Sequence, residues 1–250
     1  IIIFESSGNN LTNNTITRSE GYGIRLDSSE NNLLTNNTII NNNLTGIYAS
    51  GDSNQVNQVI NSTGITSTVS SSILKIFWYL RMYIYDIAPI ANMNVTFYNR
   101  TGKLIASALT AGHGYTREIT LLEYEDDGTT KSYNTNYTMN GTRVAAAVYN
   151  GSISYNLTSS SSVDLQIQQV ISNCMIITAE GNYILQNNIT NAPNTTCINV
   201  QANNVSIQCQ GYTIDGTDLS GSTGISISRS AITNANVKFI GVGEKVDDLE

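Results

Sequence analysis

The densest group of side chains that can do chemistry in this sequence is acidic. Glu123, Glu125, Asp126 and Asp127 lie close together in the middle of the chain. Carboxylate oxygens at this density can hold a Ca²⁺ ion. Their spacing does not match an EF-hand loop, however, and Asp127 precedes Gly128, which is a strong signal for a β-hairpin turn. We therefore expect a solvated hairpin and keep a calcium site as the weaker alternative.

A catalytic centre is not evident. The single histidine, His113, lies between Gly112 and Gly114, which favours an exposed turn over a general base or a metal ligand. The sequence contains no nucleotide-binding loop, no Cys/His metal spacing and no nucleophile elbow. We therefore expect a protein that is not an enzyme and that needs no cofactor.

Further carboxylates fall at or near expected turns, where the enzymes that cleave carbohydrates place paired acids. These residues are Asp27, Glu30, Asp52, Asp215 and Asp218. They do not recur as pairs at matching positions of successive repeats. Glycosidase or lyase activity is therefore the less favoured interpretation.

Aromatic residues concentrate around Trp78 and the tyrosines that follow it. Such rings can form a platform on which sugars stack, but the interpretation that we favour is the core of a β-sandwich. Three cysteines, Cys174, Cys197 and Cys209, fall in the last third of the chain. One disulfide among them would suit an extracellular protein, and buried, stacked thiols are an equal alternative.

Asn-x-Ser/Thr triplets, the acceptors of N-glycosylation, are frequent. The abundance of Asn and Thr produces many of them by chance. The candidate glycosylation sites in the middle of the chain are Asn94, Asn99, Asn136, Asn140, Asn150 and Asn156.

Composition limits the class of protein. Of the 250 residues only 12% are charged, the net charge is -7, and Thr, Ile, Val and Tyr outweigh good helix formers. Basic residues are scattered, which argues against nucleic-acid binding. The run Ile1–Phe4 is too short to span a membrane, and the apolar stretch 73–85 contains Lys75 and Arg81, so we expect no transmembrane segment. The sequence reads as a fragment of a longer protein.

A repeat near the start predicts how the first elements are positioned. Residues 32–39 nearly copy residues 9–16 at a shift of 23, which aligns Leu11 with Leu34 and Ile16 with Ile39. The same shift aligns Ile24 with Ile47 and Leu26 with Ala49, and it places Asn13 and Asn14 on Asn36 and Asn37. A repeat this short and this rich in Asn and Thr predicts coils of a parallel β-helix whose stacked Asn side chains form hydrogen-bonded ladders.

The composition of the sequence then changes twice. Residues 66–72 are rich in Ser and Thr and are interpreted as a linker. Turn signals about every ten residues then predict a β-sandwich. Its expected strands are 73–85, 94–98, 104–109, 119–124, 144–149 and 152–157, and strand 163–170 either closes the sandwich or leads out of it.

Short strands separated by Asn or Gly return after residue 173, at 197–200, 204–207, 212–214 and 224–227. The chain is therefore predicted to be all-β, with parallel β-helix coils on both sides of an Ig-like or prealbumin-like sandwich. The predicted domains are the last coils of one β-helix (1–69), the sandwich (73–170), the first coils of a second β-helix (173–240) and a charged tail (241–250).

Residues 173–216, with Cys197-Ile198-Asn199-Val200 and Asn204-Val205-Ser206-Ile207, resemble right-handed parallel β-helix proteins of archaeal surfaces. They are similar to the β-helix repeats of the family that includes periplasmic nitrous-oxide-reductase maturation proteins. The coils at the start of the chain resemble the same family. The middle segment, with Trp78-Tyr79-Leu80, Asn94-Val95-Thr96 and Leu122-Glu123-Tyr124, resembles the carboxypeptidase-regulatory-like, prealbumin-type sandwich.

These resemblances imply an extracellular or cell-surface module that is structural or adhesive, with cell-surface glycans or other surface proteins as partners. They imply no catalytic residue. The alternative is a β-helix protein that binds or cleaves carbohydrate and has its active coils outside this sequence.

Overall fold

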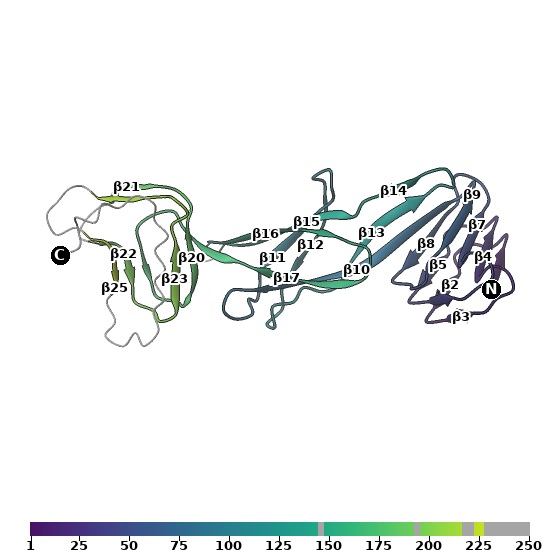
Figure 1. Cartoon of the computed structure of the whole chain (residues 1–250), viewed down its shortest axis with the longest axis horizontal. Helices are drawn as coiled ribbons and strands as arrows, with labels where there is room; N and C mark the ends of the chain where they lie inside the picture. The colour runs from purple at the N-terminus through teal and green to yellow at the C-terminus, as the bar shows by residue number, and fades with distance from the viewer. Residues whose placement is uncertain (145–147, 193–195, 217–222, 228–250) are drawn as a thin grey trace.

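The chain forms three blocks of β-structure along one long axis (Figure 1). The computed structural model describes residues 1–144, 148–192, 196–216 and 223–227. Within these ranges every regular element is a strand. The predicted all-β class is therefore confirmed. The predicted tail 241–250 lies outside the described residues.

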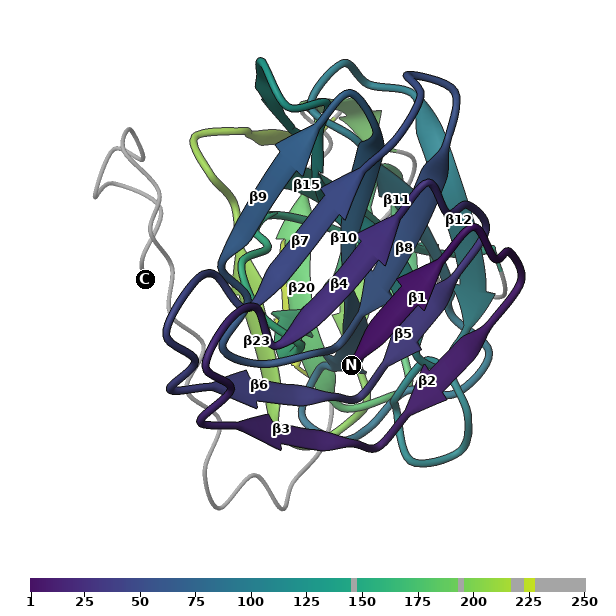
Figure 2. The same cartoon turned by 90° about the vertical axis from the view of Figure 1, so that its right-hand side faces the viewer.

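The first block is a parallel β-helix with three faces, seen end-on in Figure 2. One face contains β1 (Ile2–Phe4), β4 (Ile24–Asp27), β7 (Ile47–Ser50) and β9 (Ser67–Ser70). The second contains β2 (Asn10–Thr12), β5 (Leu33–Thr35), β8 (Val56–Ile60) and the start of β10 (Ile73–Tyr85). The third contains β3 (Thr15–Thr17) and β6 (Thr38–Ile40). The pairing confirms the alignment at a shift of 23, because Leu11 lies beside Leu34 and Ile24 beside Ile47.

Two kinds of stacked residue hold these coils together. Ile24, Leu34, Ile39 and Ile47 point inward and are at most 1% exposed, so each coil buries its apolar positions against the next. At the corners, amide side chains join successive coils. Asn9 Nδ2 donates to Asn32 Oδ1 (2.8 Å), and Asn32 Nδ2 donates in turn to Asn57 Oδ1 (3.0 Å).

The predicted Asn ladder is also present at Asn14, whose Nδ2 donates to Asn37 Oδ1 (3.1 Å). The neighbouring position has a different reason to be Asn. Asn13, Asn36 and Asn61 have φ values of 58°, 55° and 47°, a left-handed conformation that Asn tolerates better than most residues. The repeat therefore preserves Asn for two reasons, one as a member of the hydrogen-bonded ladder and one as a residue that tolerates a left-handed backbone.

The predicted linker at 66–72 is wrong. Residues 67–70 form β9, which pairs in parallel with β7 and buries Val69 in the first core. Ser and Thr alternate with this inward-facing valine, and such a pattern suits a strand with one solvated face. The last coil therefore runs into the next block without a flexible segment.

The middle block is a sandwich of two sheets. One sheet contributes β10, β13 (Ile119–Asp126), β14 (Lys131–Tyr133) and β17 (Ser161–Gln166). The other contributes β11 (Asn94–Tyr98), β12 (Leu104–Leu109), β15 (Asn136–Val144), β16 (Val148–Asn156) and β18 (Gln168–Ile171). Leu80, Met82 and Ile84 of β10 pack against Phe97 and Met139 of the opposite sheet.

Strands predicted at 144–149 and 152–157 are placed wrongly, because the observed strands are 136–144 and 148–156. The gap left between the two predicted strands, at Asn150 and Gly151, lies inside β16 instead. A Cβ atom at Gly151 would lie 2.8 Å from Cγ2 of Ile167. Close packing of the sheet, and not a turn, therefore accounts for this glycine.

Each sheet of the sandwich continues into a neighbouring β-helix. β10 pairs with β8 of the first helix through residues 73–77 and with β17 of the sandwich through residues 80–85. The predicted strand 163–170 divides at Ile167, and its second half, β18, pairs with β16 of the sandwich and with β20 of the next block. This segment therefore both closes the sandwich and leads out of it.

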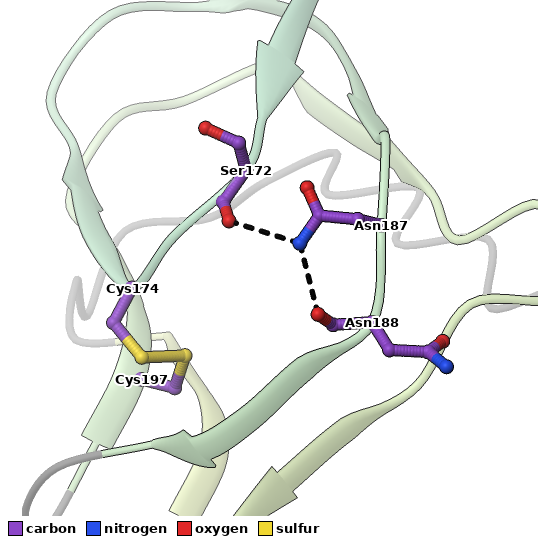
Figure 3. Close-up of a disulfide and its surroundings, with 5 residues drawn as sticks. All are labelled: Ser172, Cys174, Asn187, Asn188 and Cys197. Atoms are coloured by element: carbon purple, nitrogen blue, oxygen red, sulfur yellow. Dashed lines mark hydrogen bonds between the residues drawn. A yellow bond between two sulfur atoms is a disulfide. The ribbon is translucent and has the colours of Figure 1, made fainter.

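The third block is again built from parallel strands. Its faces contain β20 (Gly181–Leu185) and β23 (Val205–Gln208), then β19 (Met175–Ile177), β22 (Thr196–Val200) and β25 (Thr223–Ile227), and then β21 (Ile189–Ala192) and β24 (Ile214–Gly216). A disulfide joins Cys174 to Cys197, which lie 23 positions apart in sequence, across one coil with a Cα–Cα distance of 4.4 Å (Figure 3). Cys209 lies outside this bridge.

Candidate functional site

The four clustered carboxylates do not converge on a common point. Glu125 forms an ion pair with Lys75 (3.1 Å), and Asp126 forms one with Lys131 (3.6 Å). Asp127 Oδ1 accepts hydrogen bonds from the backbone nitrogens of Thr130 and Thr129 and so closes the hairpin between β13 and β14. Among the described residues, no group of three or more acidic, His or Cys side chains is placed to hold a metal ion.

Electrostatics separates these carboxylates further. Burial raises the pKa of Glu123, although the 2.6 Å hydrogen bond from Trp78 Nε1 to its Oε2 acts in the opposite direction. The hydrogen bonds from Thr130 and Thr129 lower the pKa of Asp127. The pKa of each carboxyl is therefore shifted by its own surroundings, and the two shifts run in opposite directions. The predicted hairpin is confirmed.

This hairpin closes the end of the first β-helix. Tyr124 and Trp78 pack against the core of the coils, beside Leu74 and Ile76. Ser67 Oγ donates to Asp126 Oδ2 (3.2 Å), which ties the last strand of the helix to the hairpin. An open end of a β-helix exposes its core, so these contacts serve as a cap.

Among the carboxylates at the corners of the first β-helix, Asp27 also has structural partners. Asp27 accepts hydrogen bonds from Ser50 and from Arg25, whose guanidinium also forms an ion pair with it. The hydrogen bond from Ser50 is the main cause that lowers the pKa of Asp27. A carboxyl whose ionised form is favoured is unsuited to general-acid chemistry. The side chain of Asp215, and Asp218 as a whole, lie outside the described residues.

His113 is exposed in a turn that the Gly114 N–H closes onto the Ala111 carbonyl (2.9 Å). Its Nδ1 accepts a hydrogen bond from the backbone of Tyr115 (3.2 Å), and the two rings lie 5.6 Å apart. The expected exposed turn is confirmed, and the histidine supports this turn.

Aromatic residues of β10 divide between two environments. Trp78 faces the cores, whereas Tyr83 and Tyr85 lie on the outer face with their ring centroids 5.3 Å apart. Tyr115 also lies against Tyr83, with ring centroids 4.7 Å apart and the rings tilted, and the guanidinium of Arg81 lies over Tyr115. The faces of these rings are thus occupied by one another. This tyrosine ladder shields the sheet and leaves little ring surface for a sugar.

The opposite sheet contains a feature that the sequence did not reveal. A groove of about 610 Å³, lined mostly by polar residues, lies on the outer face of β11, β15 and β16. Its lining is Tyr98, Asn99, Arg100, Gly102, Asn136, Thr138, Asn140 and Ser154. Strand pairing brings Tyr98 beside Thr138, and Thr138 beside Ser154. The available signal was the alternation in β11 and β15, which sends Val95, Phe97, Tyr137 and Met139 inward and the residues between them outward.

Several candidate glycosylation sites lie on this same face. Asn94, Asn136 and Asn156 are exposed, and Asn140 is half-buried. Asn99, in the turn after β11, is half-buried, and its Oδ1 accepts three hydrogen bonds from Thr101 and Lys103. The side chain of Asn150 lies outside the described residues.

The fold is therefore that of an all-β protein with parallel β-helix coils joined to an antiparallel sandwich. Residues 1–76 match the family described as the right handed beta helix region, which confirms the predicted β-helix in this part of the chain. In a comparison with curated proteins, no protein matches the chain. Among the described residues there is no helix long and apolar enough to cross a membrane.

A comparison with solved structures includes the Bacillus anthracis TIE protein. The identity is 15% and the TM-score 0.31, over 46% of this chain and 22% of that protein. The chain therefore spans less than a quarter of that protein's length. A likeness at this level carries no argument about this chain.

Proposed function

We propose that this chain is a non-enzymatic structural module of a protein exported to the cell surface, where it acts as a stiff rod. The observation that carries this proposal is the pair of shared strands. β10 belongs both to the first β-helix and to the sandwich, and β18 belongs both to the sandwich and to the third block. A bend at either junction would have to break backbone hydrogen bonds within a sheet.

Side-chain contacts reinforce the first junction. Where β8 ends beside β10, the Tyr79 backbone N–H donates to Ser160 Oγ (2.9 Å). Ser160 Oγ in turn donates to Asn61 Oδ1 (2.6 Å), which belongs to the last coil of the first helix. The same hydroxyl thus bridges the position at which β8 is replaced by β17 as the neighbour of β10.

The surface location is supported by three features. A disulfide within one coil suits an oxidising compartment. The low charged fraction and the frequent Asn-x-Ser/Thr triplets suit a protein outside the cytoplasm. We also propose that the β-helix blocks are related to archaeal surface proteins and that the sandwich is of the carboxypeptidase-regulatory-like type.

The alternative is a β-helix protein that binds or cleaves carbohydrate and has its active coils outside this sequence. The described coils add no support for cleavage, which needs two carboxylates that face one substrate, because Asp27 instead faces Arg25 and Ser50. The proposed role as a rod needs only the continuous sheets.

Small-angle X-ray scattering tests the proposed stiffness. A compact chain of this length has a radius of gyration of about 18 Å. We expect a clearly larger value and a profile that fits one rigid, elongated particle. Ser160→Ala, which removes the bridging hydroxyl but leaves β10 intact, should give the same profile. A compact particle, or a profile that requires independently moving parts, would contradict the proposal.

The cellular location needs a separate measurement. An antibody raised against the chain should label intact cells of the source organism. Labelling that appears only after the cells are lysed would refute a surface location and would leave the rigidity of the rod untouched.

A further inference from the structure

The groove on β11, β15 and β16 contains side chains that have no partner among the described residues. Among the described residues, the ring of Tyr98 stacks on no other ring, in contrast to Tyr83, which lies between Tyr85 and Tyr115. Tyr98 lines the groove and is half-buried. An aromatic face that borders a hollow and is not covered by another ring can pack against the apolar face of a sugar.

The amides on the same face differ in whether they can bind a ligand. Asn136 is exposed and forms no side-chain hydrogen bond within the described part of the chain. The Oδ1 atom of Asn140 is buried and has no hydrogen-bond partner there either. Asn99 is different, because its Oδ1 already accepts three hydrogen bonds in the turn. Asn136 therefore keeps hydrogen-bonding capacity for a ligand, since an amide both donates and accepts, whereas Oδ1 of Asn140 is closed off from solvent.

Hydroxyl groups lie between these amides. Thr138 follows Asn136 by two residues along β15 and so faces the same side of the sheet. Its Oγ1 lies 3.3 Å from Ser154 Oγ on β16. Amides and hydroxyls on neighbouring strands thus present alternating donors and acceptors, the pattern that the hydroxyls of a sugar can match.

Charge narrows the class of ligand. Arg100 is the charged residue among those that line the groove, and the lining contains no carboxylate. A guanidinium binds a carboxylate through two parallel hydrogen bonds. On a chain with a net charge of -7, a local cation beside neutral polar groups favours an acidic ligand at this position.

We infer that this groove is a binding site for a saccharide that carries a carboxylate. One sugar ring packs on Tyr98, its hydroxyls bond to Asn136, Thr138 and Ser154, and the carboxylate pairs with Arg100. This binding site does not depend on the proposed role as a rod. Scattering measures the stiffness of the chain and oligosaccharide binding measures the site, so either proposal can fail without the other.

The test is a glycan array with neutral and uronic-acid-containing oligosaccharides, probed with the whole chain made in a host that does not glycosylate it. We expect binding to acidic oligosaccharides, followed by titration calorimetry with the best of them. Tyr98→Ala and Arg100→Ala should each weaken this binding by about tenfold or more, which corresponds to about 1.4 kcal/mol. Tyr85→Ala, which changes a tyrosine of the opposite sheet, should bind within about twofold of the wild type.

Asn136→Ala keeps the test decisive if a Tyr98 variant does not fold, because Asn136 is exposed and forms no side-chain hydrogen bond. It should melt like the wild type and bind more weakly. Three results would overturn the site: no oligosaccharide bound, binding confined to neutral sugars, or unchanged affinity in folded Tyr98 and Asn136 variants. A glycan found by mass spectrometry on Asn136 or Asn140 of the native protein would also overturn it, since an attached sugar would fill the groove.

Discussion

Asp86, at the end of β10, binds Asn182 of β20, although 96 residues separate them in sequence. Asp86 Oδ1 accepts a 2.6 Å hydrogen bond from Asn182 Nδ2, and both carboxylate oxygens face the Asn182 backbone nitrogen at 3.1–3.2 Å. The carboxylate is only 6% exposed. A turn that leaves the first sheet of the sandwich is thereby fixed to the first full coil of the third block.

Asp86→Ala should loosen this junction. The substitution leaves the backbone and side-chain N–H groups of Asn182 without their charged acceptor, which costs about 2–3 kcal/mol. Hydrogen exchange should quicken in β20 and β23 and stay unchanged in β4 and β7. Asp164→Ala, on the exposed face of β17, is the matched control and should change neither region. Equal exchange in Asp86→Ala and the wild type would show that the contact contributes nothing to the junction.

Gly181 explains why the contact is so close. Its φ is 148°, and a Cβ atom there would lie 2.5 Å from both Asp86 Oδ2 and Gln169 Nε2. The sequence shows this glycine but not its reason, because Asp86 and Gln169 approach it only after the sandwich and the third block have been joined.

Ile47→Asp should unfold the first β-helix. Ile47 is fully buried between coils, and an unpaired carboxylate in this position should destabilise the block by at least about 3 kcal/mol. Ile40→Asp is the matched control, because Ile40 belongs to a neighbouring strand of the same coil and is 40% exposed. It should change stability by no more than about 0.5 kcal/mol. Thermal melts followed by circular dichroism compare the two, and a similar melt for both would refute the coil alignment.

The repeat made the first β-helix the most predictable part of the chain. Where the same residue types return at a fixed shift, as Leu11 and Leu34 do, each position can be inferred from its copy. The sandwich lacks such copies, so the bounds of the strands around Gly151 were predicted wrongly and the close packing of this glycine was not foreseen. The Ser/Thr run before β10 was interpreted as a linker because its composition outweighed its alternation around Val69.

The candidate groove lay beyond sequence reasoning for a different physical reason. Tyr98, Thr138 and Ser154 are far apart in sequence and become one row only through the register of three strands. The alternation within β11 and β15 was visible, but the order of the strands in the sheet was not. The acidic cluster shows the reverse case, in which residues that are close in sequence do not form one site. Glu125 and Asp126 are neighbours in sequence but point to opposite faces of a strand.

Reduction of the disulfide should destabilise the third block selectively. The bond between Cys174 and Cys197 closes a loop of one coil, and a cross-link of this length contributes about 3 kcal/mol, chiefly by restricting the unfolded chain. In reductant, hydrogen exchange should quicken in β19 and β22 while β5 and β8 keep their protection. Cys174→Ser/Cys197→Ser should show the fast exchange without reductant and no further response to it. A Cys209→Ser variant should keep the response to reductant, because Cys209 lies outside the bridge. A reductant response in the double variant would contradict this assignment.

Tyr137 should make the protein sensitive to alkaline pH. Burial raises the pKa of its phenol from 10.0 to about 12, and the hydrogen bond to the Leu122 carbonyl only partly opposes this effect. Between pH 10 and 12 the unfolded chain therefore releases a proton that the folded protein retains, so stability falls as the pH rises through this range. Tyr137→Phe removes this hydrogen bond, so its free energy of unfolding at neutral pH should be about 1 kcal/mol lower than that of the wild type. Its stability should also decline less steeply at alkaline pH. Urea denaturation at pH 8 to about 11.5 measures both effects, with the exposed Tyr212→Phe as the control. An alkaline decline as steep in Tyr137→Phe as in the wild type would assign the sensitivity to another group.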